Sequence, residues 1–179
     1  EGFRRIVREF ETIADSDIPL PDGIGATLRS YQEEGYRWLC LLGKLGFGGI
    51  LADDMGLGKT LQTIAYLLHE AYDRTQGRAG TSLVVCPASL VYNWMAELER
   101  FAPGLKACAV VGSKTRRRDV IAAAGSFDVL VTSYDYVRRD IDLLASLSFG
   151  TVVLDEAHYI KNAKTQAARS VKRLSAKRR

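Results

Sequence analysis

Unbroken apolar runs alternate along this chain with longer stretches in which apolar residues recur every three or four positions. Surface helices produce the second pattern, and strands buried on both faces of a parallel sheet produce the first. The apolar runs lie at 82–86, 106–111, 127–134 and 151–154, and the helical stretches at 61–71, 90–101, 113–124 and 137–147. This alternation predicts an α/β fold in which helices cover both faces of a mostly parallel sheet.

Further helical segments precede this core. Residues 3–14 carry apolar side chains at helical spacing, and residues 16–25, rich in Asp, Pro and Gly, are typical of a linker. A second helix follows, in which Ser30 and Glu33 have capping-box spacing. Gln32 in its first turn is either a solvated polar residue or, because an amide offers a donor beside an acceptor, a reader of an adenine edge.

The segment 48–60 has the order of a phosphate-binding loop: a short apolar strand, a turn with glycines, and the start of an amphipathic helix. Gly56 and Gly58 let the backbone turn its N–H groups inward, and the helix N-terminus adds partial positive charge. Lys59 would reach the β- and γ-phosphates, and the Thr60 hydroxyl would ligate the phosphate-bound Mg²⁺.

Two carboxylates follow the apolar run 151–154. Asp155 can hold Mg²⁺ through the water shell of the metal, which completes the site that Thr60 begins. Glu156 can orient or deprotonate the water that attacks the γ-phosphate. The alternative for an Asp-Glu pair after a strand is capping of the next helix. His158 is either a core histidine or a residue beside the γ-phosphate that couples the nucleotide to a neighbouring lobe.

Each motif taken alone could have a purely structural role. The presence of both motifs in one chain makes a nucleotide-binding role more plausible than two separate structural ones. The general phosphate-loop pattern places another glycine where this chain has Asp53, so an ordinary turn and helix start is the alternative for that segment. In doubly wound sheets, ligands bind at the carboxyl ends of the strands. The segments 53–60 and 155–158 both follow apolar runs, and we therefore expect them to lie on one rim of the sheet.

Composition narrows the class of protein without deciding its partner. The chain has 179 residues, of which 47% are hydrophobic, enough for one domain with a sizeable core. A net charge of +4 permits a nucleic-acid partner without proving one. Cys40, Cys86 and Cys108 lie far apart in apolar segments, which favours reduced, buried thiols. The triplet 116–118, all Arg, is more often a solvated helix face than a nucleic-acid patch, and residues 165–179 are predicted to form a helix with a basic end.

Neither export nor a membrane is indicated. Residues 1–8 are charged and lack the apolar core of a signal peptide. No apolar run is long enough to cross a bilayer. We therefore expect an intracellular protein with no membrane partner, cytoplasmic at the nucleoid in a bacterium or nuclear in a eukaryote.

Five segments together resemble the Swi/Snf-type DNA translocases of helicase superfamily two. They lie in family order at 28–39, 48–60, 83–101, 129–140 and 153–166, so the resemblance covers nearly everything from residue 28 onward. Asp-Glu-Ala-His followed by Tyr-Ile-Lys-Asn is closely similar to family usage, and so is Asp-Asp-Met-Gly, which accounts for the absent glycine. The resemblance implies a three-layer RecA-like P-loop NTPase domain, the first lobe of such a motor.

The resemblance also implies roles for individual residues. Lys59 and Glu156 would be catalytic, Glu156 as the base, and Thr60 and Asp155 would bind the metal. The nucleotide-binding residues it implies are Gln32 as adenine reader, Asp54, Met55, Gly56, Leu57, Gly58, Lys59, Thr60, Leu61 and His158. ATP and Mg²⁺ are the implied cofactors. Segments 87–93 and 132–134 resemble loops that touch the DNA backbone.

A longer motor is the further implication. Residues 1–27 are expected to form an N-terminal helix and linker, and 28–179 lobe one, ending before the coupling motif and the second RecA-like lobe. The implied activity is ATP-driven movement on double-stranded DNA by both lobes, with this segment alone nearly inactive. The alternatives are a nucleotide-binding regulatory module, or another superfamily-two motor such as a restriction-enzyme subunit or RNA helicase. The Tyr-Ile-Lys-Asn extension at 159–162 favours the Swi/Snf motor over the last two.

Overall fold

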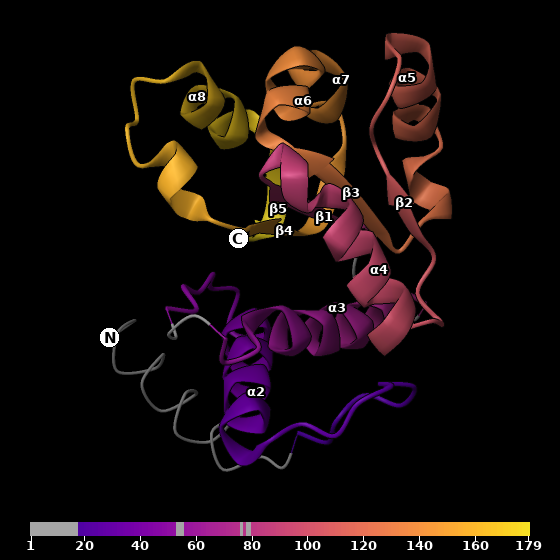
Figure 1. Ribbon diagram of the computed structural model, residues 1–179, viewed down its shortest axis with the longest axis vertical. Coiled ribbons are helices and arrows are strands. Elements are labelled where there is room, and N and C mark those ends of the chain that lie inside the picture. Colours follow the sequence, from indigo (N-terminus) through magenta and orange to yellow (C-terminus); the bar gives the residue numbers. More distant parts are fainter. Residues whose placement is uncertain (1–17, 53–55, 76, 78–79) are drawn as a thin grey trace.

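A five-stranded sheet in the order β2-β3-β1-β4-β5 forms the centre of the protein, with every neighbouring pair parallel (Figure 1). The computed structural model describes residues 18–52, 56–75, 77 and 80–179. The strands are β1 (Ser82–Cys86), β2 (Ala107–Ala109), β3 (Val129–Ser133), β4 (Ser148–Leu154) and β5 (Ser175–Arg178). The helices are α2 (Ser30–Lys44), α3 (Lys59–Thr75), α4 (Val91–Phe101), α5 (Lys114–Ala122), α6 (Tyr134–Arg139), α7 (Ile141–Leu144) and α8 (Gln166–Arg173). Short 3-10 turns form η1 (Ala88–Leu90), η2 (Ala124–Ser126) and η3 (Ala157–Ile160).

Both faces of the sheet are covered, which explains the unbroken apolar runs. On one face α3 and α4 pack Ile64 and Leu98 against Val84 of β1. On the other face, α5 to α8 pack against alternate residues of the same strands, such as Leu83 and Leu130. Helix α2 adds an outer layer behind α3, on the side away from the sheet (Figure 1). The predicted three-layer α/β arrangement is therefore confirmed, whereas the helix expected at 3–14 lies outside the described residues.

The predicted helix over 165–179 is only partly correct. Helix α8 ends at Arg173, Leu174 is 2% exposed, and Ser175–Arg178 then pair in parallel with β4 from Ser148 to Thr151. The chain turns into a strand here because burial of Leu174 in the core brings the backbone beside β4. Non-local pairing thus outweighs the local helical preference of this basic stretch.

The predicted strand at 48–52 is also absent from the described elements. In this segment Gly49 donates a backbone hydrogen bond to the carbonyl of Arg179 at 3.1 Å, and Ile50 is 86% exposed. A strand requires a hydrogen-bonded neighbour along its length, and a contact at one residue does not supply it.

The arginine triplet contains one buried member. Arg117 is 5% exposed, and its Nε and Nη2 donate to the two carboxylate oxygens of Asp140 at 2.5 and 3.0 Å. Its Nη1 donates to the carbonyl of Gly112 at 2.6 Å, and the guanidinium lies 4.4 Å from the centre of the Tyr136 ring. The prediction of a solvated face is therefore wrong for Arg117. Asp140 also separates α6 from α7, where one continuous helix was predicted.

The remaining sequence expectations concern cysteines and membranes. Cys40 and Cys86 are buried and Cys108 is half-buried, and none of them is in a disulfide. Among the residues that the structure describes, no helix combines the length and apolar character needed to span a bilayer.

A candidate nucleotide site at the carboxyl edge of the sheet

Three strands of the sheet end at the same edge. Val85 of β1 pairs with Leu154 of β4, and Cys86 pairs with Ser133 of β3. The residues that follow these strands, including Asp155, therefore leave the sheet side by side. The Asp155 backbone N–H continues the ladder with a bond to the carbonyl of Val85 at 2.9 Å.

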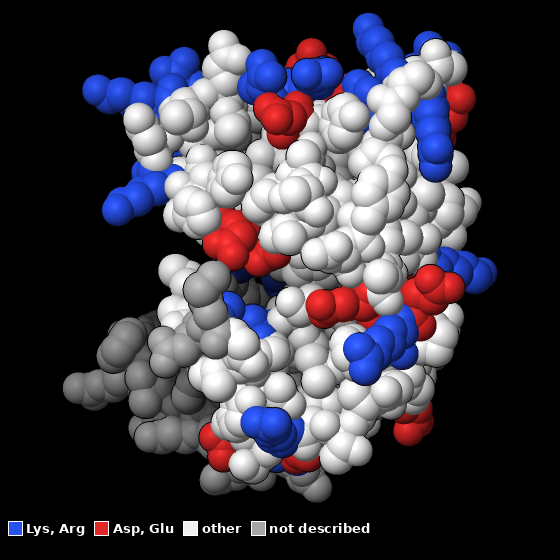
Figure 2. Space-filling view, in the orientation of Figure 1, with Lys and Arg blue, Asp and Glu red and all other residues white. Residues whose placement is uncertain are grey.

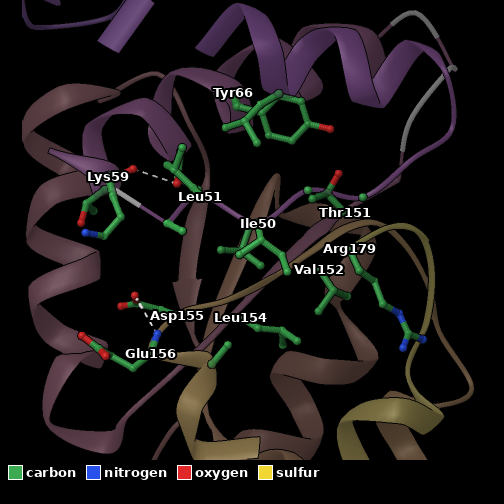
Figure 3. A pocket seen from close by; sticks show the side chains of 18 of the residues that line it. Ile50, Leu51, Lys59, Tyr66, Thr151, Val152, Leu154, Asp155, Glu156 and Arg179 are labelled. Atoms are coloured by element: carbon green, nitrogen blue, oxygen red, sulfur yellow. Dashed lines mark hydrogen bonds between the residues drawn. The ribbon is translucent and has the colours of Figure 1, made fainter. Parts of the chain in front are cut away.

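A cavity of about 1050 Å³ opens at this edge, and it gathers most of the predicted site residues. The predicted residues that line it are Gly56, Gly58, Lys59, Thr60, Leu61, Asp155, Glu156 and His158. Lys59 and the Asp155–Glu156 pair lie toward one end, whereas Ile50, Val152 and other apolar side chains line the middle (Figure 3). Figure 2 shows the hollow on the surface, with acidic side chains above it and basic ones below. The two motifs therefore do converge on one rim.

The phosphate-loop backbone has the geometry that its glycines predict. Gly56 and Gly58 have φ values of 85° and 74°, in the left-handed region that glycine adopts without steric cost. A Cβ on Gly58 would lie 2.3 Å from Nε2 of Gln32, so this position also needs the absence of a side chain. Lys59 and Thr60 are the first two residues of α3, where the helix dipole favours an anion. Asp54 and Met55 lie outside the described residues.

Gln32 is neither solvated nor part of the cavity lining. It is 7% exposed, its Oε1 accepts from the backbone N–H of Arg29 at 2.9 Å, and its Nε2 donates to the Leu57 carbonyl at 3.2 Å. The helix start is therefore capped at Arg29 by Gln32, and not by Ser30 and Glu33 as predicted. Gln32 joins the first turn of α2 to the phosphate loop, and its contact with adenine stays a prediction.

The acidic motif is held by several hydrogen bonds. Asp155 Oδ1 accepts from the backbone N–H of Glu156 at 3.0 Å, and its Oδ2 accepts from Nε1 of Trp94 at 2.9 Å. Glu156 has φ 50° and ψ 49°, the left-handed conformation, which is strained for a residue with a side chain. Its Oε2 lies 3.1 Å from Nδ1 of His158, and neither side chain is buried. Glu156 occupies the N-cap position of η3, but its side chain makes no capping hydrogen bond, and the alternative of a core His158 is wrong.

Trp94 and Tyr134 also belong to this site, although no sequence motif indicates it. Trp94 is 5% exposed, and because a buried indole N–H needs an acceptor, its Nε1 donates to Asp155. The Tyr134 hydroxyl donates to the Asp155 carbonyl at 2.7 Å, and its ring stacks on Tyr159 with centres 5.5 Å apart. Burial first, and then the charge of Asp155, raise the pKa of the Tyr134 phenol well above its usual range, which keeps it a donor.

The two segments expected to touch DNA differ in exposure. Ala88, Ser89 and Tyr92 of the first segment are exposed. Thr132 and Tyr134 of the second are 0% and 4% exposed, and both side chains bond inside the protein. The side chains of 132–134 are therefore not presented to a ligand on the surface.

Comparison with known proteins settles the family. The family described as SNF2-related domain matches residues 31–179. The chain belongs to this family. It is 43% identical over 169 residues to the TATA-binding protein-associated factor MOT1 of Saccharomyces cerevisiae, covering 89% of this chain and 9% of that protein. It is 41% identical over 155 residues to the helicase SWR1 of Mycosarcoma maydis, covering 85% and 8%.

A solved structure supports the same conclusion for the fold. The Sulfolobus solfataricus SWI2/SNF2 ATPase core in complex with dsDNA matches with a TM-score of 0.81 and 38% identity, over 92% of this chain and 33% of that one. The Swi/Snf resemblance and the RecA-like fold are thereby confirmed. This SNF2-related domain spans about a tenth of the length of the curated relatives it matches.

Proposed function

We propose that this SNF2-related domain binds Mg·ATP and, together with a second RecA-like lobe, hydrolyses it to drive movement on double-stranded DNA. The observation that carries the proposal is the shared cavity. Lys59 and Thr60 at the start of α3, and Asp155 and Glu156 at the end of β4, line it together. A lysine at a helix N-terminus and a pair of carboxylates on one rim are the two halves of a nucleotide-hydrolysis site.

The donor set fits a magnesium-bound triphosphate. A hydroxyl and a carboxylate are oxygen donors of the kind that Mg²⁺ prefers, and Thr60 and Asp155 supply them. Bound Mg²⁺ would neutralise charge on the β- and γ-phosphate oxygens. Lys59 adds charge to the same phosphates from the helix N-terminus. Glu156 takes the proton of the attacking water, and His158, bonded to it at 3.1 Å, orients its carboxylate from the solvent side.

A second lobe is in keeping with the length of the matched structure. The Sulfolobus core is about three times as long as the segment it shares with this chain. Residues 48–52 and 152–154 line the apolar part of the cavity, beside the polar residues of the proposed nucleotide site.

The distribution of positive charge on the surface supports a nucleic-acid partner. Lys and Arg side chains gather along the upper edge of the molecule, over α5, α6 and α8 (Figure 2). The exposed basic residues of these helices are Lys114, Arg116, Arg118, Arg138, Arg139, Arg169, Lys172 and Arg173. Such a surface attracts the phosphate backbone without reading sequence. The related SWI2/SNF2 core is described in complex with dsDNA, which favours duplex DNA as the partner.

The experiment that tests the proposal compares Lys59→Ala with Lys106→Ala, an exposed lysine outside the cavity. Titration with a fluorescent ATP analogue in Mg²⁺ should show about 10- to 100-fold weaker binding for Lys59→Ala, since a hydrogen bond to a charged group is worth about 1.5–3 kcal/mol. Lys106→Ala should bind as the wild type does, and thermal melts of both should be unchanged. Equal affinity in the two variants would refute the phosphate role.

Phosphate release separates a motor from a regulatory module. In the full-length protein, turnover should rise when duplex DNA is added. In the 179-residue domain alone it should be negligible, because an arginine supplied by a second lobe is typically worth about 10³–10⁵ in rate. Nucleotide binding without turnover in the full-length protein would favour the regulatory module.

A further inference from the structure

We propose that Trp94 and Tyr134 are positioning residues, which hold the carboxylate and the backbone of Asp155 in the orientation that magnesium binding requires. The inference rests on the proposed function, since it takes Asp155 as a metal-binding residue. Trp94 lines the cavity and Tyr134 does not, and each is joined to the proposed metal-binding residue by a hydrogen bond to Asp155, so both act through Asp155.

Trp94 fixes the carboxylate. Its indole lies on α4, whose packing against Val84 and Val131 of the sheet sets its position. Nε1 donates to Oδ2 of Asp155 at 2.9 Å while the Glu156 N–H donates to Oδ1 at 3.0 Å. With one donor on each oxygen, the carboxylate cannot rotate without losing both bonds. The remaining lone pairs of the carboxylate then keep one fixed direction, in which they can accept hydrogen bonds from the water molecules of a bound metal ion.

Tyr134 fixes the backbone at the same residue. Its hydroxyl donates to the Asp155 carbonyl at 2.7 Å, directly before the left-handed Glu156. Its ring is stacked on Tyr159 at an interplanar angle of 2°, so the chain is held on both sides of Glu156. A left-handed residue with a side chain costs of order 1–3 kcal/mol and persists only where its surroundings hold it. These contacts are such surroundings.

The two donors also connect separate parts of the fold to Asp155. Trp94 is on the helix that follows β1, and Tyr134 is the first residue of the helix that follows β3. A ligand that displaces either helix therefore changes a hydrogen bond to Asp155. This gives the nucleotide site a direct mechanical link to the surfaces that α4 and α6 present.

The test uses the full-length protein and measures how much Mg²⁺ tightens the binding of a fluorescent ADP analogue, as the ratio of dissociation constants in EDTA and in Mg²⁺. Trp94→Phe keeps an aromatic ring but removes the N–H donor. Because loss of a hydrogen-bond partner of a metal ligand typically costs about 10- to 100-fold in metal affinity, the ratio should fall about tenfold. Affinity in EDTA should not change. Trp38→Phe is the matched control, since Trp38 is the other of the two tryptophans and is 37% exposed on α2.

Asp155→Asn separates failure of this inference from failure of the proposed function. If Asp155→Asn keeps the full magnesium effect, the metal role of Asp155 is wrong. If Asp155→Asn loses the effect but Trp94→Phe keeps it, the positioning role is overturned while the proposed function stands. If Trp94→Phe binds the ADP analogue more weakly by the same factor in EDTA and in Mg²⁺, Trp94 contributes through packing alone. That result would also overturn the positioning role. If Trp94→Phe does not fold, Tyr134→Phe, which loses one hydroxyl and keeps the Tyr159 stack, decides the question by the same ratio.

Discussion

Replacing Arg117 by Ala should be the most destabilising change among the surface helices, although its neighbours in sequence are exposed arginines. The guanidinium makes two bonds to Asp140 and one to the Gly112 carbonyl, and it packs on the Tyr136 ring. Hydrogen bonding to Asp140 raises the pKa of Arg117, so the guanidinium stays charged. Arg117→Ala therefore leaves a buried carboxylate whose two nearest donors are gone.

The magnitude follows from the burial of both partners. Their side chains are 7% and 4% exposed, so water cannot replace the lost bonds. Removing one member of a buried pair typically costs about 3–5 kcal/mol, a large part of the total stability of a domain. For a domain of this size that corresponds to a fall in melting temperature of roughly 6–20 °C.

Urea unfolding of the 179-residue domain measures this loss. Arg118→Ala is the matched control, because its side chain is 66% exposed and its contact with Asp119 is 4.0 Å long, and it should change stability by less than about 0.5 kcal/mol. Replacing both partners, as Arg117→Met with Asp140→Leu, should recover most of the loss since no charge is then left buried. Equal, small effects of Arg117→Ala and Arg118→Ala would refute the argument that this pair holds α5 against α6 and α7.

Two further predictions concern the site and the core. Glu156→Gln in the full-length protein should still bind ATP but lose turnover by about 10²–10⁴-fold, the usual worth of a general base, and near-normal phosphate release would show that the base is elsewhere. Burial first, and then the charge of Asp155, raise the pKa of the Cys86 thiol from 9.0 to about 12. Above pH 9 the unfolded chain therefore loses this proton before the folded one does, so stability should fall by about 1.4 kcal/mol by about pH 10. Urea unfolding at neutral and alkaline pH measures this fall, and an equally steep fall in Cys86→Ala would show that Cys86 is not its source.

The sequence predicted those features that depend on local pattern. Burial on both faces leaves an unbroken apolar run, and for this reason β1 and β4 were found within a few residues. A glycine loop followed by Lys59 and Thr60 marks a helix start, and α3 begins at Lys59. Placing Asp155 and Lys59 on one rim required only the rule for the carboxyl ends of parallel strands.

The features that were missed depend on partners far away in the chain. Trp94 and Asp155 are 61 positions apart, and no local pattern indicates that an indole and a carboxylate will meet. Arg117 differs from Arg116 and Arg118 only in the side of α5 from which it projects, and its burial depends on Asp140. Strand β5 exists because β4 is beside it, whereas its own composition favours a helix.

Because Glu156 has a left-handed backbone, the residue that would be most stable at this position differs from the residue that the proposed chemistry requires. Glycine would adopt its φ of 50° without the cost that a side chain carries there, so random mutagenesis followed by selection for heat resistance would favour glycine at this residue. The same replacement would remove the proposed base. Variants selected for heat resistance without an activity screen are therefore expected to include inactive proteins with glycine at this position. A consensus-based stabilisation of the domain should leave Glu156 unchanged.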